Sequence, residues 1–579
     1  MPEQHISNAF RIEIGGKPLP PGVDVTRVEV EDHVHLPDAF SLTIRDAART
    51  ALADSAAKIG ATAKISVLSD AAPGPEVLLD GEVTAIEAEL HGGASYTIVR
   101  GYDQSHRLFR GRVTASYLNM TYSDVAEKVA DRNHLGVGTI DSTSPTHPHI
   151  TQANESDWTF LVRLAREVGH ELTVSDGKLQ FRAPGESTSA PGRKDLGADN
   201  PLALLAGSSL LGLRATVSAA EQVKEVEVRG WDPGAKRALV VTAAASTKVV
   251  ENGSSTAEVA RSFPAPPLVA TGTPLSTEKD VELAANALAE EVAASQTEIE
   301  GRARGNPKLR AGTAVRIGLL GAPFDGKYVL TTTCHSFSPD EGYVTSFVIS
   351  GRQDRSTLAL ASGGGGGLPS RIEGVAPAVV DDVNDPDQKC RVRLRLPWLS
   401  DDYVSDWTRV AQAGAGKSRG WLLLPEVGDE VLVSFDQGDV RRPFVLAGLY
   451  NDTDTPDVGP DPLIDRSNKS VTNRLFTSRK GHQLVFTDGD DECAVLVQSA
   501  DKKLSVRLDQ AQKKITIRSE GDLDIKVDGN IKIEAKGKLE MSGQSVTAEA
   551  QSSFSAKGAQ VSVEGSGPVK VSGQPIQLN

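Results

Sequence analysis

The chain has 579 residues, a length that predicts about four domains rather than one. Its 62 Lys and Arg residues are outnumbered by 77 Asp and Glu residues, and the resulting charge of −15 argues against a bulk nucleic-acid binder. The 39% hydrophobic fraction excludes a mostly disordered chain. Three widely separated cysteines, Cys334, Cys390 and Cys493, exclude a disulfide scaffold and a structural zinc site, and we expect them to be buried, inert thiols.

The N-terminal residues show no basic stretch followed by an apolar core, so we predict no signal peptide. No window approaches the roughly 18 apolar residues that a membrane-spanning helix needs. We therefore expect assembly in the cytoplasm, in a particle that stays there or is released from the cell. Aromatic residues make up only 5% of the chain, which favours strands and turns over a large aromatic-lined pocket.

Residues 1–361 read as two strand-rich units joined by helices, an α+β arrangement weighted toward β. Apolar and polar residues alternate, as in half-buried strands, at 10–14, 26–30, 63–67 and 82–86. A helix is predicted from Ser156, as N-cap, to a C-cap at Gly169. A longer one is predicted from Thr277 to Glu298, with an apolar stripe of Ala284, Leu288, Val292 and Ile299.

A glycine-rich linker is predicted at 362–370, and the short strands that follow it fit a small closed barrel of the OB type at 371–452. The strand segments are 391–398, 421–433 and 444–448. Arg391, Arg393 and Arg395 share one strand face, but acidic residues surround them. We therefore expect a solvated face, or ion pairs with a neighbouring subunit, in place of a nucleic-acid site. Residues 453–514 are assigned to a connector and the start of the next element.

From Ile515 to Asn579 the sequence divides into units of eight residues. In the first three units positions one and three are apolar and position seven is glycine, which we expect to take a positive φ in a tight turn. The predicted core residues are Ile515, Ile517, Leu523, Ile525, Ile531, Ile533, Val561 and Val563, and the predicted turn residues are Gly521, Gly529 and Gly537.

One chain of such strands would bury only every second side chain and leave both edges open. Three chains that wind around one axis remove both problems, so we predict an intertwined homotrimeric β-helix at 515–579. A single-chain β-solenoid remains the alternative. The overall prediction is a mainly β protein with two β-barrel-like hub domains, an OB-fold collar and this needle.

The run 152–161 with Arg163-Leu164-Ala165 and Gly169, and the segments 321–326, 328–330 and 335–338, resemble the hub domain of phage baseplates and VgrG proteins, the central spikes of contractile injection systems. Within 371–450 the matching motifs resemble the spike OB domain, and the octads with the closing residues 573–579 resemble the needle. Those collar motifs are Arg391-Val392, Leu396-Pro397-Trp398, Ser405-Asp406-Trp407, Gly420-Trp421, Leu424 to Val431, Gly438-Asp439 and Pro443.

The resemblance implies a structural, non-enzymatic homotrimer that ends the inner tube, docks the baseplate and punctures a target membrane when a sheath contracts. It also implies inner-tube and baseplate partners, a PAAR-type tip protein and effector cargo. We expect tip contacts at Pro575, Ile576, Leu578 and Asn579. Only about 60 residues separate Tyr450 from the regular octads, so we expect no inserted enzyme domain, and no toxin after the needle.

Other chemistry is weakly represented. His33 and His35, and His147 and His149, have spacings that could place two imidazoles together, but without a recognisable metal-ligand pattern. The basic run Arg302–Arg304 reads as a solvated helix end. No nucleophile motif is found, so we predict no cofactor, no metal and no catalytic residue. The alternative function is a trimeric tail spike or fibre that binds or degrades surface glycans, although Phe554 is the only aromatic residue after position 500.

Overall fold

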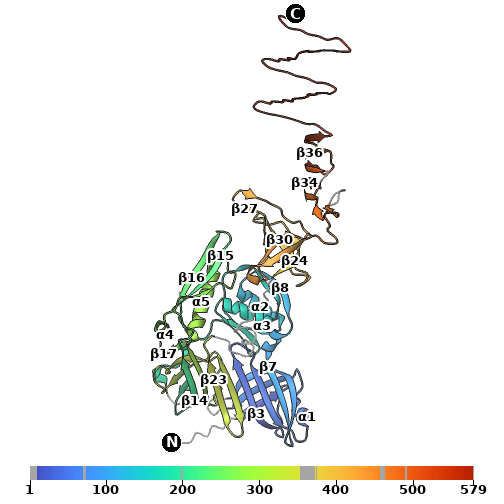
Figure 1. Cartoon of the computed structure of the whole chain (residues 1–579). Helices are drawn as coiled ribbons and strands as arrows, with labels where there is room; N and C mark the ends of the chain where they lie inside the picture. The colour runs from blue at the N-terminus through green and yellow to red at the C-terminus, as the bar shows by residue number, and fades with distance from the viewer. Residues whose placement is uncertain are drawn as a thin grey trace. The chain divides into compact units, whose positions relative to one another are not determined.

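The computed structural model describes residues 9–68, 74–196, 200–352, 372, 374–456, 463–489 and 492–577. The chain divides into two compact units, Met1–Thr455 and Pro456–Asn579, which we describe separately. Figure 1 shows the order of the elements along the chain. The glycine linker predicted at 362–370 lies outside the described residues.

The first unit is built on a sheet of eleven strands that contains both halves of the hub. The antiparallel pair β3 and β22 joins the two halves. The predicted strands at 10–14, 26–30, 63–67 and 82–86 are confirmed and lie in β1, β3, β5 and β6. In sheet order the strands are β14 (Leu210–Val217), β19 (Thr297–Arg304), β23 (Gly342–Ile349), β22 (Thr332–Ser338), β3 (Asp24–His33), β4 (Ala39–Arg45), β7 (Ala94–Asp103), β6 (Glu76–His91), β5 (Thr62–Leu68), β1 (Ala9–Ile14) and β2 (Lys17–Pro18).

A second core forms where α2 (Tyr122–Arg132) and α3 (Asp157–Glu167) pack among short strands. The predicted start of α3 is confirmed, because the Ser156 hydroxyl accepts a hydrogen bond from the Thr159 amide. Gly169 follows the helix with φ +72°, the left-handed conformation that a helix end requires. The strands here are β8 (Val113–Met120), β10 (His147–Glu155), β9 (Gly136–Ile140), β11 (Glu171–Ser175) and β12 (Lys178–Arg182).

The long helix α5 (Glu278–Ala294) begins after Thr277 as predicted but ends four residues earlier than Glu298. Residues 297–304 alternate buried and exposed side chains in β19, so strand periodicity decides this segment and Ile299 belongs to the sheet. The basic run Arg302–Arg304 also lies in β19, which corrects the predicted helix end. The buried positions of α5 are Val281, Ala285, Ala289, Val292, Ala293 and Ala294.

The helix α5 covers a small sheet, and a four-stranded sheet completes the hub. The small sheet holds β16 (Arg237–Ala244), β15 (Glu225–Asp232) and β18 (Leu268–Ala270). The four-stranded sheet holds β13 (Ala203–Leu205), β20 (Ala314–Gly318), β21 (Gly326–Val329) and β17 (Val250–Asn252). Short helices lie at α1 (Ala51–Ser55), α4 (Thr256–Ser262), η1 (Gln104–Phe109), η2 (Ser187–Ser189) and η3 (Arg193–Asp195).

The predicted collar barrel is confirmed as five strands closed in the order β24-β25-β26-β30-β29. Its strands are β24 (Val375–Asp382), β25 (Arg391–Arg395), β26 (Thr408–Val410), β29 (Glu430–Phe435) and β30 (Pro443–Gly448), with η4 (Asp436–Gly438) between the last two. The strand expected from Trp421 begins only at Glu430. Residues 421–426 have no regular secondary structure and 427–428 form a turn, after the hairpin β27 (Ala415–Gly416) and β28 (Arg419–Gly420), because the barrel has closed without them.

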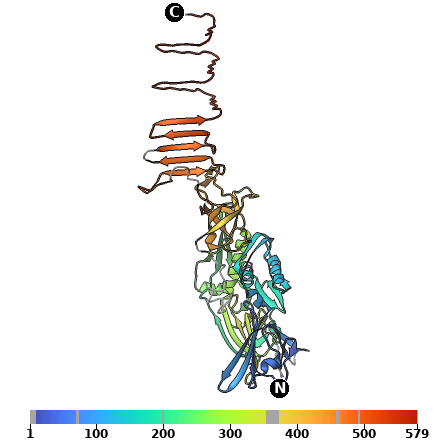
Figure 2. The ribbon, with the colours of Figure 1, turned by 90° about the vertical axis from the view of Figure 1, so that its right-hand side faces the viewer.

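The second unit opens with β31 (Ile464–Asp465) and β32 (Ser470–Val471), and continues as an antiparallel meander of five strands. The meander strands are β33 (Asn473–Thr477), β34 (Gln483–Asp488), β35 (Cys493–Gln498), β36 (Leu504–Asp509) and β37 (Lys514–Ser519). After β37 the described chain makes no β-ladder with itself up to residue 577, and Figure 2 shows it turning back and forth.

Backbone bends mark the repeat in this last region. They fall at 520–521, 528–529, 536–537, 544, 551–552, 559–560, 566–567 and 574–575, which is close to one bend every eight residues. Gly521, Gly529 and Gly537 lie in bends, but none has the positive φ that we expected. The later bends do not fall where the predicted division into octads places them. As a result, the repeats there begin near Val561 and Val569, two residues before the predicted starts at Val563 and Val571.

Candidate functional site

The histidine pairs singled out in the sequence are engaged in structural contacts. The His33 ring lies 3.0 Å from the Thr332 hydroxyl, Nδ1 to Oγ1. His147 stacks on Tyr122 with ring centroids 4.5 Å apart, and His149 Nε2 lies 3.2 Å from the Val404 carbonyl oxygen. Among the residues that the structure describes, no three His, Cys, Asp or Glu side chains lie close enough to hold a metal ion.

The cysteines correct one expectation, because none of the three is fully buried. Cys390 is exposed, and Cys334 and Cys493 are half-buried. Burial, with the nearby Glu31 and Glu29 charges, raises the pKa of the Cys334 thiol to about 11. A thiol with this pKa stays protonated at neutral pH and is a poor nucleophile.

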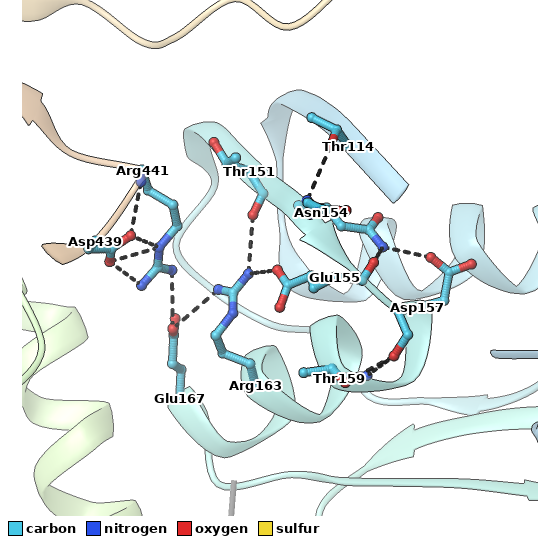
Figure 3. Close-up of polar contacts among 12 residues, drawn as sticks. Thr114, Thr151, Asn154, Glu155, Asp157, Thr159, Arg163, Glu167, Asp439 and Arg441 are labelled. Carbon is cyan, nitrogen blue, oxygen red and sulfur yellow. Dashed lines mark hydrogen bonds and ion pairs between the residues drawn. The ribbon is translucent and has the colours of Figure 1, made fainter. Parts of the chain in front are cut away.

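A cluster of charged side chains lies where the hub meets the collar, and Figure 3 shows it. Arg163 of α3 pairs with Glu155 at 2.6 Å and lies 3.7 Å from Glu167, one turn further along the helix. Arg441 of the collar donates a hydrogen bond to the same Glu167 carboxylate at 3.2 Å. It also donates hydrogen bonds to both carboxylate oxygens of Asp439 at 2.8–3.0 Å. The alternating charges of Glu155, Arg163, Glu167, Arg441 and Asp439 therefore join hub to collar, and we call these five residues the junction cluster.

Charge rather than burial decides the ionisation of this cluster. Burial alone would raise the pKa of Glu167, but the Arg441 and Arg163 guanidinium groups outweigh it and hold that pKa below its ordinary value. Burial would likewise raise the pKa of Asp439, but the Arg441 guanidinium outweighs it and lowers that pKa. The Glu167 and Asp439 carboxyl groups are therefore charged at neutral pH.

The carboxylate of Asp157 links the segments of β10 and α3 that carry the junction cluster. Asp157, in the first turn of α3, accepts hydrogen bonds from Gln152 at 2.7 Å and Asn133 at 2.6 Å, and pairs with Arg132. Two more contacts cross the same junction, from the Tyr403 hydroxyl to Thr151 at 3.3 Å and from Arg442 to Ser276 at 3.0 Å. The hub end of β10 and α3 is thus held in a fixed geometry against the collar.

The collar arginines find their partners within the chain. Arg391 donates to both oxygens of Asp385, at 3.0 and 2.7 Å, and Arg395 pairs with Asp381 at 3.2 Å. Arg393 lies over the Trp407 ring, 4.9 Å from its centroid. Arg391 and Arg395 are thus paired within the chain, and ion pairs of this face with a neighbouring subunit stay a prediction.

The predicted needle residues present an apolar surface in the single chain. The eight predicted core side chains are 57–74% exposed, and in the meander Val497, Leu504, Val506 and Leu508 are exposed as well. Their role as a core therefore stays a prediction. Of the predicted tip residues, Ile576 is 47% exposed, whereas Leu578 and Asn579 lie outside the described residues.

Sequence reasoning missed the junction cluster as a unit. Arg163 and Asp439 stand in the motifs that carry the family resemblance, but their partners Glu167 and Arg441 do not. One signal was available: Arg163 sits among Phe160, Leu161 and Leu164 on the apolar face of α3, where an arginine requires a buried partner. The identity of that partner depends on a fold that brings residue 441 beside residue 167.

Comparison with known proteins places both parts of the first unit. Residues 4–339, more than half of the chain, match the family model of the Alg8 N-terminal domain. Residues 376–450 match the model of the type VI secretion system/phage-baseplate injector OB domain. Among the described residues, no helix combines the length and the apolar composition that crossing a membrane requires.

Curated relatives match over shorter segments. The type VI secretion system spike protein VgrG1a of Pseudomonas aeruginosa is 32% identical over 135 residues, 21% of this chain and 21% of that protein. The spike protein VgrG3 of Vibrio cholerae is 36% identical over 103 residues, 17% of this chain and 10% of that protein. The matched segments thus span 21% and 10% of these relatives.

Solved structures share the fold over most of the chain. A chain of the half-lidded Francisella PdpA-VgrG complex aligns with a TM-score of 0.52 at 10% identity, covering 89% of this chain and 88% of that chain. A chain of the lidless complex aligns with a TM-score of 0.50 at 9% identity, covering 88% and 98%. The predicted resemblance to VgrG spikes is confirmed.

Proposed function

We propose, for a chain that belongs to the Alg8 N-terminal domain family, that it works as the non-enzymatic, homotrimeric spike of a contractile injection system. Three hubs would close the end of the inner tube and dock the baseplate. Three collars would follow, and three intertwined chains would form the needle that punctures a target membrane on sheath contraction. The domain bounds of this proposal are 1–361, 371–452 and 515–579, with 453–514 leading into the needle.

The observation that carries the proposal is the unpaired needle. Over the described residues 520–577 the chain makes no β-ladder with itself, and its predicted core side chains are more than half exposed. Unpaired strand backbone beside alternating apolar side chains is unstable in water, since both need partners. Two further copies of the same chain supply both, and the apolar positions then meet at the common axis.

The collar carries a second apolar surface of the same kind. Trp421 and Leu422 are 62% and 64% exposed, and Leu423, Leu424 and Val427 beside them are exposed too. This segment lies outside the barrel strands, so the collar's own fold does not need it. An exposed apolar run of this size is typical of a subunit contact, and it supports trimeric collars.

The junction cluster suits a protein that transmits force. A push on the hub reaches the collar through charge pairs, and these pairs act over a short range and resist displacement. Nothing in the cluster resembles a nucleophile with its base. The proposal therefore assigns mechanical work to the chain and no reaction.

The remaining partners follow from the same proposal. Inner-tube and baseplate proteins would contact the hub, and effector cargo would travel with the particle. A PAAR-type tip protein would cap the needle at Pro575, Ile576, Leu578 and Asn579. The target membrane would be touched only transiently.

The deciding measurement is the mass of the full-length chain by light scattering after size exclusion. A trimer predicts 3 × 61.2, about 184 kDa, and particles with a bulky head and a thin rod in negative stain. Removal of residues 515–579 should abolish the rod and weaken the trimer. A stable 61.2 kDa monomer at micromolar concentration would contradict the proposal.

A further inference from the structure

A groove lies between the hub and the collar, and both of its walls belong to the same chain. It consists of one hollow of about 600 Å³ and another of about 330 Å³, which adjoin because they share part of their lining. The collar lines both hollows with Arg409, Arg442 and Phe444. The hub lines both with Pro274 and Leu275. We call the two hollows together the collar groove.

The larger hollow is lined by more positive than negative charge. Five of its lining side chains are Lys or Arg, and the acidic ones are Asp280, Asp406 and Asp436. Burial lowers the pKa of His147 and His149, which also line it, so both rings are neutral at neutral pH. The chain as a whole has a net charge of −15. The collar groove is therefore a locally positive region of an acidic protein.

Two of the five cations have no carboxylate partner. Ion pairs within the chain, at 3.0, 2.7 and 2.8 Å, hold Lys389, Arg391 and Arg441. Arg409 and Arg442 form no ion pair with any Asp or Glu in the part of the chain that the structure describes, the lining aspartates included. The excess positive charge of the collar groove therefore comes from these two arginines.

The surroundings of these two arginines differ from those of a solvated surface charge. Arg409 lies over the Phe444 ring, with its guanidinium carbon 4.7 Å from the ring centroid. Arg442 is half-buried and donates a hydrogen bond to the Ser276 hydroxyl at 3.0 Å. Burial and the neighbouring Arg441 charge outweigh the attraction of nearby aspartates and lower the pKa of Arg442. Because a half-buried cation without a counter-ion is costly, a bound anion would stabilise it.

The size and the lining of the collar groove favour a peptide over a single anion. Guanidinium groups bind carboxylates and phosphates alike, so charge alone does not choose the ligand. A phosphate ion would leave most of the larger hollow, about 600 Å³, unfilled. The smaller hollow is also lined by Trp231, whose side chain is 50% exposed. A peptide can place carboxylates on the two arginines and apolar side chains against Phe444 and Trp231, whereas the net charge of −15 argues against a nucleic acid.

We infer that the collar groove binds an acidic peptide segment of a partner protein. Arg409 and Arg442 bind the carboxylates of this segment, and Phe444 and Trp231 contact its apolar side chains. This ligand goes beyond the proposed function, because a spike that only transmits force does not require it. One chain supplies both walls of the groove, so the site does not rest on the proposed homotrimer.

The test measures peptide binding to the full-length protein by fluorescence anisotropy. The probe is a fluorescein-labelled peptide of Glu, Ala and Phe residues, which should bind, and the same peptide with Gln in place of Glu should not. Arg409→Gln and Arg442→Gln should each weaken binding about tenfold, because each removes charge-assisted hydrogen bonds to a carboxylate. Arg419→Gln is the matched control and should bind normally. Arg419 is exposed in the same collar, has no ion pair among the described residues and does not line the groove.

Several results would overturn the inference. One is a failure of the unaltered protein to bind the Glu peptide, and another is equal affinity of Arg409→Gln, Arg442→Gln and Arg419→Gln for it. Complete displacement of the peptide by inorganic phosphate, or tighter binding of single-stranded DNA, would assign the two arginines to another ligand. Because Arg442→Gln also removes the Ser276 contact, tryptophan fluorescence checks its fold, and Arg409→Gln decides the test if it is unfolded. A monomeric chain that still binds the peptide would contradict only the proposed function.

Discussion

Replacement of Arg441 by methionine tests whether the junction cluster holds hub and collar together. Methionine has a similar length and no charge, so the change removes the guanidinium with little loss of volume. Three hydrogen bonds to Asp439 and one to Glu167 disappear. Glu167 keeps its contacts with Arg163 and Tyr122, but both carboxylates lose their closest cation.

The expected loss in free energy of unfolding follows from the burial of the Arg441–Glu167 ion pair. Breaking a buried ion pair by removing one partner costs about 3–5 kcal/mol. The Arg441 and Glu167 side chains are 21% and 20% exposed, so we expect the lower end, about 3 kcal/mol. Arg395→Met is the matched control in the same collar, because its ion pair with Asp381 is 46% and 35% exposed and should contribute less than about 1 kcal/mol.

Urea unfolding followed by tryptophan fluorescence measures the difference, since Trp158 and Trp407 lie on the two sides of the junction. The double variant Glu167→Gln with Arg441→Met should recover part of the lost stability. Of the two carboxylates that lose Arg441, Glu167 and Asp439, only Asp439 is then still charged. Equal midpoints for Arg441→Met and Arg395→Met would refute this account of the junction.

Three other predictions concern separate parts of the chain. Burial raises the pKa of Asp103 to about 7, above its unfolded value, so the free energy of unfolding should fall as the pH rises from about 4 to about 7, by about 1.4 kcal/mol per pH unit for this group. The variant Asp103→Asn should make the free energy of unfolding depend less on pH across this range, and an unchanged pH dependence would contradict the assignment. Ile533→Asp should abolish the trimer in light scattering while leaving hub unfolding unchanged, because this side chain is 71% exposed in the single chain; a variant that remains trimeric would count against the needle core. Ser156→Ala removes the N-cap of α3 and should cost about 1 kcal/mol in urea unfolding, whereas Ser156→Thr, which keeps the hydroxyl, should cost less.

Local patterns were sufficient for much of the fold. Alternation at 26–30 is preserved in the sheet because one face of the strand must be buried wherever its neighbours lie, whereas at 63–67 it is interrupted at Ser66, which is buried as well. The cap at Ser156 and the turn at Gly169 act within a few residues, so they too are readable from sequence. The same reasoning gave a small closed collar barrel and the eight-residue bends of the needle.

Errors arose where distant residues competed for the same segment. The helix α5 gives way to β19 because residues 297–304 have partners on both β14 and β23, which local helix propensity cannot reveal. Trp421 to Val427 looks like a strand in sequence but finds no place in a barrel that five other strands close. In the needle, Gly521 and its equivalents lie in bends without a left-handed backbone, since a gradual bend does not require one.

The sequence by itself determined the periodicities of this protein, because strand alternation, helix caps and the eight-residue repeat depend on neighbours a few positions away. Only the tertiary structure decided which distant charges meet, as when Glu167 of the hub receives Arg441 from the collar across 274 residues of sequence. A charged residue at a buried position indicates from sequence that it has a partner, but only the fold of the chain determines which residue that partner is.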